Sequence, residues 1–399
     1  MAAAEVISDV RPRAISVRWI IGPRADLVWF IGSVLSSYAL LFLYLKEIIP
    51  LIPMVAVWAV FIDAPHVFGT FSRTYFDRAE RHHRGPLLWG SLLFFFVGPM
   101  LVLLGAGLVF FFLAAVWAYY HLVKQHYGFM VLYKKKNDDL APVDNALDRL
   151  LLLFAFNYPF VAFIAADREA MMRVPGVLHS GISQLAGLLL AGTIVVGIVW
   201  LGRQVQRAIS GERLDLPKYL LLAAAIPMHW IVLLTPMPHK PIAIVAILTI
   251  YHNLQYHRLI WFHNQKYKSQ SRLIAGHGGL YGRADSPSDF ASGIRKNEAN
   301  TGQIHELRQK YGAAELISRR LSYYIAFGII FGIIYQGPRQ LLGYIALRSG
   351  QAPATTEQSL LVQLGISFLW GYAFIHYYLD SKIWRVRRDP AVGRALKMD

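Results

Sequence analysis

The chain alternates between long apolar runs and shorter polar segments. Residues 86–123 and 220–239, for example, contain no charged residue. An apolar run of about 20 residues is what a helix needs to cross the hydrocarbon core of a bilayer. The pattern therefore predicts about ten transmembrane helices. We expect them near residues 26–46, 50–71, 87–104, 107–133, 147–166, 183–202, 219–235, 242–264, 321–336 and 359–381.

Composition agrees with this pattern and narrows the class of protein. Of the 399 residues, 55% are hydrophobic and only 16% are charged, so the chain does not resemble a set of soluble domains. We predict an all-α fold, a polytopic transmembrane helical bundle. The sequence has no cysteine, which excludes disulfides and thiolate metal sites.

The net charge of +16 would suit a nucleic-acid partner, but the positions of the charges indicate a membrane orientation instead. With the N-terminus in the cytoplasm, nearly all lysines and arginines fall in or beside cytoplasmic segments. This asymmetry is the positive-inside rule, and it predicts both termini in the cytoplasm. We expect a multi-pass protein of a bacterial inner membrane, with no nucleic-acid partner. The basic residues left for the outer side are Lys46, Arg168, Arg173, Lys240, Arg339 and Arg348.

The predicted helices divide the chain into membrane and cytoplasmic parts. The longest cytoplasmic loop, 265–320, places Ile304, Leu307, Tyr311 and Leu316 near one helical face, which predicts an amphipathic helix on the membrane surface. The expected parts are a cytoplasmic tail (1–25, without the pattern of a signal peptide), helices 1–8 (26–264), the loop (265–320), helices 9 and 10 (321–381) and a basic tail (382–399).

Six histidines lie in the inner halves of the predicted helices 2, 4, 8 and 10, and two of them, His121 and His252, lie about one and a half turns deeper than the other four. Four of them precede a basic residue at the cytoplasmic boundary by six to nine residues, which places them roughly 10–13 Å inside it. Ionisable side chains are costly in a membrane and indicate a functional site. The six are His66, His121, His126, His252, His257 and His376.

Two carboxylates accompany these histidines on the same helix faces. Asp63 precedes His66 by three residues, and Asp380 follows His376 by four. Nitrogen and oxygen ligands of this kind suit iron, zinc, copper or manganese. We therefore predict a metal site built from the six histidines with Asp63 and Asp380. The side chains expected to support the ligands are Gln125, Gln255, Tyr120 and Tyr251.

Helix geometry complicates the simplest version of this site. Histidines five apart, such as His121 and His126, differ by about 140° in direction on an ideal helix. Either each such pair serves two metal positions or a π-bulge realigns it. Pro65 removes a backbone donor in front of His66, which predicts a distortion of helix 2.

Four segments resemble the integral-membrane multi-histidine non-heme iron enzymes, which include desaturases, hydroxylases and bacterial carotene-cleaving dioxygenases. They are DAPH at 63–66, HLVKQHYG at 121–128, YHNLQYH at 251–257 and HYYLD at 376–380. The usual desaturase boxes, with histidines four apart, are absent. The resemblance implies iron, as one or two ions, and oxidation of an apolar substrate.

We therefore expect a membrane-embedded metalloenzyme, a non-heme iron oxygenase or desaturase acting on a hydrophobic, lipid-like molecule. One alternative is a proton or metal-ion transporter, because intramembrane histidine and aspartate also form relays. Another is a membrane scaffold or assembly factor. The loop 265–320 is basic, which suits either anionic membrane lipid or an acidic electron carrier.

Overall fold

The computed structural model describes residues 15–268, 304–348 and 359–398, and these are almost entirely helical. Most of the predicted loop 265–320 lies outside the described residues, as do residues 1–14 of the predicted N-terminal tail. The elements, in chain order, are β1 (Ile15–Ser16), α1 (Pro23–Ala25), η1 (Asp26–Ile31), α2 (Val34–Leu45), α3 (Leu51–Trp58), η2 (Ala59–Asp63), α4 (Ala64–Arg73), α5 (Arg78–Ser91), α6 (Phe94–Leu103), α7 (Gly107–Lys136), α8 (Pro142–Ala166), α9 (Arg168–Met171), η3 (Gly176–Leu178), α10 (His179–Ile209), β2 (Leu214–Asp215), α11 (Leu216–Leu234), α12 (Lys240–His263), η4 (Asn264–Tyr267), α15 (Ala313–Ser318), α16 (Leu321–Arg348), α17 (Leu360–Ile383) and α18 (Pro390–Ala395).

Within the described residues, nine helical segments are long and apolar enough to cross a membrane. They indicate a multi-pass membrane protein. The predicted span 242–264 forms helix α12, which is not among the nine. Its second half carries His252, Asn253, Gln255 and His257, and these side chains lower its mean hydropathy. The count of ten spans and the cytoplasmic placement of both termini remain predictions.

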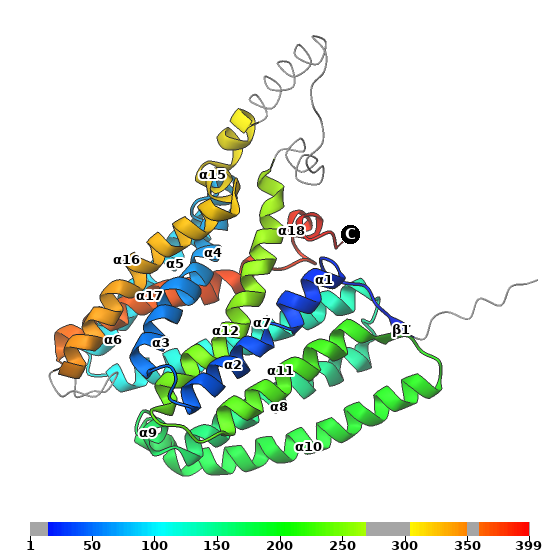
Figure 1. The fold of residues 1–399 in the computed structure, drawn as a ribbon, viewed down its shortest axis with the longest axis horizontal. Helices are drawn as coiled ribbons and strands as arrows, with labels where there is room; N and C mark the ends of the chain where they lie inside the picture. Colours follow the sequence, from blue (N-terminus) through cyan, green and yellow to red (C-terminus); the bar gives the residue numbers. More distant parts are fainter. Residues whose placement is uncertain (1–14, 269–303, 349–358, 399) are drawn as a thin grey trace, which may run out of the picture.

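Helix α12 is the central element of the bundle. It packs against α2, α3, η2, α4, α7 and α11, and it contributes residues to both large apolar cores. Helix α10 lies along one edge, packed on α8, and α16 lies toward the opposite edge, packed on α4 and η2 (Figure 1). A polar residue on α12 is therefore surrounded by protein, which is the arrangement that intramembrane polar groups require.

The predicted distortion of helix 2 takes the form of a π-helix. Helices α3, η2 and α4 follow one another without a break, and η2 is a five-residue π-helical segment that ends two residues before Pro65. Because Pro65 cannot donate to the carbonyl of residue 61, a wider turn is favoured at this point. The π-helix lies in helix 2 and not between the paired histidines of helix 4 or helix 8, since α7 and α12 continue as α-helices there.

A network of buried ion pairs joins the ends of α7, α8, α10 and α11. The carboxylate of Asp148 binds the ammonium groups of Lys134, at 2.5 Å, and Lys218, at 3.2 Å, and all three side chains are fully buried. Asp139 binds Lys218 and Arg207 in the same network. Each buried charge has partners of opposite sign, which is the condition under which buried charges are tolerated.

Candidate metal centre

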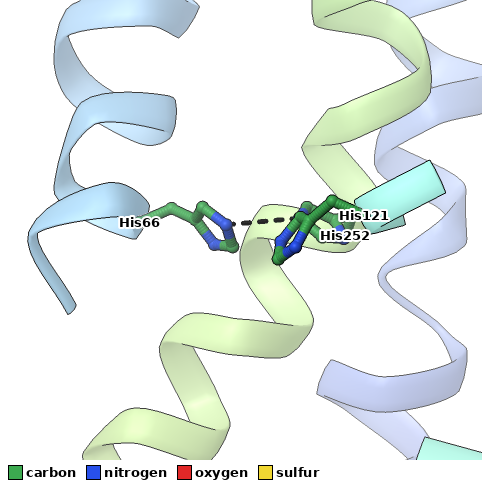
Figure 2. Close-up of side chains that lie close together, drawn as sticks. All are labelled: His66, His121 and His252. Atoms are coloured by element: carbon green, nitrogen blue, oxygen red, sulfur yellow. Dashed lines mark hydrogen bonds between the residues drawn. The ribbon is translucent and has the colours of Figure 1, made fainter. Parts of the chain in front are cut away.

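Four of the six predicted histidines converge inside the bundle, each from a different helix. His66 comes from α4, His121 from α7, His252 from α12 and His376 from α17, and all four are buried. The Nε2 atom of His66 lies 2.9 Å from Nε2 of His376 and 3.2 Å from Nε2 of His252. Figure 2 shows the rings of His66, His121 and His252 brought together, with the contact between His66 and His252 dashed.

His121 completes this cluster. Its ring centroid lies 4.6 Å from that of His376 and 5.3 Å from that of His252, and its Nε2 atom is buried without a hydrogen-bond partner among the described residues. Ligand atoms of His66, His121 and His252 all lie within 4.8 Å of one another, as do those of His121, His376 and Asp380. These groups could hold a metal ion. We call His66, His121, His252 and His376 the four-histidine cluster.

The spacing of the nitrogens suits metal ligands. Two nitrogens bound to one ion at 2.0–2.1 Å lie about 2.8–3.4 Å apart, depending on whether the angle between them is octahedral or tetrahedral. The two contacts of His66 Nε2, at 2.9 Å and 3.2 Å, fall inside this interval. Contacts between neighbouring imidazole nitrogens at this distance are otherwise satisfied only when one of each pair carries a proton.

Hydrogen bonds around His376 fix which of its nitrogens is free. Its Nδ1 lies 2.7 Å from the hydroxyl of Thr70, and that hydroxyl lies 2.6 Å from Oδ1 of Asp380. Tyr256 also donates to Asp380, at 2.8 Å. Because an ionised carboxylate only accepts, Thr70 donates to Asp380 and accepts the Nδ1 proton of His376. The Nε2 lone pair of His376 then faces His66.

This protonation state leaves neutral histidines unable to satisfy both contacts of His66. If the single Nε2 proton of His66 is donated to His376, nothing remains for the contact with His252. If His252 donates instead, two lone pairs face each other between His66 and His376. A single cation can accept all these lone pairs at once. A histidine ligand is usually supported by a carboxylate on the side of its other ring nitrogen, and Asp380 supports His376 in this way through Thr70.

Two predicted histidines are not among the mutually close ligand atoms, although the ring of His257 lies 6.2 Å from that of His66. The ring of His257 bonds through Nε2 to the carbonyl of Ile62, at 3.1 Å, and through Nδ1 to the hydroxyl of Tyr324, at 3.3 Å. His126 is turned to the other side of α7, where Nδ1 donates to the carbonyl of Leu122. The direction change of about 140° between residues five apart separates each histidine from its partner in the sequence motif.

The two predicted carboxylates have different surroundings. Asp380 lies beside the cluster and supports His376 through Thr70. Asp63 is not in either group of mutually close ligand atoms, and it accepts instead from the side-chain amides of Asn253 and Gln336, each at 3.3 Å.

The predicted supporting side chains reach the site only indirectly. Gln125 donates to the carbonyl of His252, and so ties α7 to α12 at the level of the cluster. Gln255 and Tyr251 both donate to the carbonyl of Phe30 and therefore fix α12 against η1. Tyr120 is largely exposed on the bundle surface.

Sequence reasoning missed the residues that contact the cluster most closely. Thr70 and Tyr256 each follow a cluster histidine by four residues, so helical spacing could have found them. The ring of Tyr377 stacks on His121, with centroids 4.5 Å apart. His229 on α11 packs against His126, with ring centroids 5.3 Å apart.

A cavity of about 440 Å³ opens onto the cluster, and all four cluster histidines contribute to its wall. Most of the wall is apolar and comes from α3, α7, α8, α12 and α17. The cavity extends along α12 toward its first turn, where Pro241 and Ile242 line it, and it also reaches Ala170 and Val174 beside α9. Cavities of this kind, apolar with a few convergent polar groups, are typical of sites for small molecules.

The fold and the site together define a helical, multi-pass membrane protein with a buried histidine cluster that could hold a metal ion and that faces an apolar cavity. No known protein family, curated protein or solved structure matches the chain.

Proposed function

We propose that the protein is a membrane-embedded, histidine-ligated metalloenzyme, a non-heme iron oxygenase or desaturase that acts on an apolar, lipid-like substrate. The observation that supports this most is the four-histidine cluster with its supporting network at Thr70 and Asp380, open to an apolar cavity. Four imidazoles without a thiolate suit iron, and zinc, copper and manganese are the other metals that such ligands accept.

We favour a single ion. The two groups of close ligand atoms share His121, and a second ion on Asp380 would compete with the hydrogen bonds that Asp380 accepts from Thr70 and Tyr256. When bound, iron would supply the one-electron chemistry with dioxygen that oxidation of unactivated carbon requires. The protein's part is to hold neutral imidazoles with their lone pairs directed inward and to keep the ligand set apart from bulk water.

The cavity accounts for the proposed substrate class. Side chains such as Trp58, Phe112, Leu248 and Trp370 line it, so a hydrocarbon bound there would exclude water from the cluster. A substrate of this kind would come from the bilayer. We place the protein in a bacterial inner membrane with both termini in the cytoplasm, which the distribution of basic residues supports.

Metal content tests the proposal directly. The detergent-purified protein would be analysed by elemental mass spectrometry, with His121→Ala and the matched control His126→Ala. We expect about one iron per chain in the wild type, loss of the metal in His121→Ala and retention in His126→Ala, because His126 bonds to the carbonyl of Leu122 away from the cluster.

Three outcomes would count against the proposal. Absence of stoichiometric metal after reconstitution with iron, zinc and manganese would favour a scaffold. Equal loss of metal in both variants would mean that the cluster is not the binding site. Bound metal with no oxygen consumption in the presence of apolar lipids would favour transport.

A further inference from the structure

A second polar group lines the same cavity and is not used by the four-histidine cluster. It consists of Asp63 at the end of η2, Asn253 on α12, and Gln336 and Arg339 on α16. We call these four side chains the polar subsite. Asp63 lies one helical turn before His66, about 4.5 Å along the axis, and Asn253 directly follows His252. The polar subsite is therefore adjacent to the cluster.

The carboxylate of Asp63 determines how the two amides are oriented. Oδ1 accepts from Nδ2 of Asn253 and Oδ2 accepts from Nε2 of Gln336, each at 3.3 Å. Turning either amide around would bring its carbonyl oxygen against a carboxylate oxygen, so the amide nitrogens must face Asp63. The amide carbonyl oxygens consequently point elsewhere.

Those two carbonyl oxygens have no partner in the part of the chain that the structure describes. Oδ1 of Asn253 and Oε1 of Gln336 are buried without a hydrogen bond among the described residues, and the two side chains are at most 2% exposed. Both side chains line the cavity. A buried acceptor without a donor is costly, so a hydrogen-bond donor that reached either oxygen from the cavity would be stabilised there.

Arg339 adds a donor to the same group. Its guanidinium lies over the ring of Trp370, 4.8 Å from the centroid, and both residues line the cavity. The polar subsite thus offers two unpaired acceptors, a carboxylate and a guanidinium. Only a group that both donates and accepts matches this set. A carboxylate ligand would be repelled by Asp63, and a ketone could not satisfy the unpaired carbonyl oxygens.

We propose that the polar subsite binds the hydroxyl group of an amphipathic substrate, a long-chain alcohol whose hydrocarbon part fills the rest of the cavity. The hydroxyl donates to the amide oxygens and accepts from Arg339. This inference rests on the proposed function for the reaction, but binding at the polar subsite does not require metal. Because the subsite adjoins His66 and His252, the carbon oxidised lies within a few bonds of the hydroxyl.

The experiment compares three probes of equal chain length: hexadecan-1-ol, hexadecane and hexadecanoate. Each would compete with isotope-labelled hexadecan-1-ol for the full chain in lipid nanodiscs, with and without removal of metal by chelator. We expect the wild type to prefer the alcohol over the alkane and over the carboxylate at least tenfold, with or without metal.

The matched variants are Gln336→Met and Gln340→Met. Gln336→Met keeps the side-chain length but removes the unpaired acceptor, so we expect it to lose most of the preference for alcohol while its affinity for hexadecane is unchanged. Gln340 also lines the cavity, one residue beyond Arg339, and is outside the proposed subsite. Gln340→Met should therefore keep the preference.

Each result decides something different. Equal binding of alcohol and alkane by the wild type would refute the polar subsite, as would tightest binding of hexadecanoate, because Arg339 alone would then dominate. A preference for alcohol that survives in Gln336→Met would also refute it. If the protein binds no metal but shows the preference, the proposed oxidation fails while the hydroxyl subsite stands.

Discussion

The hydroxyl of Thr70 links the metal-ligand candidate His376 to Asp380, and its removal should weaken metal binding. This hydroxyl contacts three groups: Nδ1 of His376 at 2.7 Å, Oδ1 of Asp380 at 2.6 Å and the hydroxyl of Tyr256 at 2.7 Å. Thr70 itself is fully buried. The substitution Thr70→Val removes the hydroxyl and leaves a side chain of nearly the same shape, so packing changes little.

The magnitude follows from the proton on His376. Without metal, His376 in Thr70→Val can move its proton to Nε2 and lose little. Metal binding requires the lone pair at Nε2, which forces the proton onto Nδ1. Without the Thr70 hydroxyl, no acceptor among the described residues lies within hydrogen-bond distance of Nδ1, since Oδ1 of Asp380 is 3.8 Å away. Leaving one buried donor unpaired costs about 1–3 kcal/mol. That corresponds to a loss of metal affinity of roughly 5–150-fold, which includes the 10–100-fold typical of such supporting residues.

The assay is a competitive titration of iron and zinc against a chelator, with Thr70→Ser as the control. Serine keeps the hydroxyl, so Thr70→Ser should retain affinity within a few-fold of the wild type. Wild-type affinity in Thr70→Val would refute the argument. Equal losses in the valine and serine variants would show that the methyl group, and not the hydroxyl, supports the site.

Three further predictions concern stability, each measured by thermal unfolding in detergent. Asp148→Asn should destabilise the protein by about 3–5 kcal/mol, because it leaves two buried lysines short of a counter-charge; the double variant with Lys134→Met should recover part of the loss, and no recovery would contradict the pairing. Gly332→Ala should lower the free energy of unfolding by about 1–3 kcal/mol, because an added Cβ would clash with the backbone carbonyl of Val60 in η2. Gly337→Ala, on the same helix, would place its Cβ more than 4 Å from any described neighbour and should leave stability unchanged. Burial lowers the pKa of Lys266 to about 8, so the unfolded chain binds more protons between about pH 8 and 10; the wild type should gain stability relative to Lys266→Met as pH rises through that interval, and a constant difference would refute the assignment.

Much of the candidate site could be read from spacing along single helices. The depth estimate put four histidines in one layer and placed His121 and His252 about one and a half turns deeper, whereas the cluster joins those two with His66 and His376 of the layer. The same periodicity predicted that residues five apart point in different directions. His126 and His257 both make hydrogen bonds to backbone carbonyls outside the cluster, although the ring of His257 stays 6.2 Å from that of His66. The residues that orient the ligands could also have been predicted from the sequence, because Thr70 and Tyr256 lie four residues after His66 and His252 on the same helix faces.

Other parts depend on which helices are neighbours, which spacing along one helix does not reveal. His229 contacts His126 only because α11 packs on α7. Asp63 was expected to bind metal with His66, but α16 brings Gln336 to it from 273 residues away. No local pattern around residue 63 indicates that contact.

The sequence by itself determined the helices, the membrane class and the helix face on which each polar residue lies, because these depend on hydrophobic run length and on 3.6 residues per turn. Only the tertiary structure decided which faces meet, since every apolar helix in a bilayer has many partners of similar hydrophobicity. Packing around α12 brings His66, His121, His252 and His376 together. It also leaves the side-chain oxygens of Asn253 and Gln336, two residues that line the cavity, buried without a hydrogen-bond partner among the described residues. The chemistry of this protein depends on those contacts between helices.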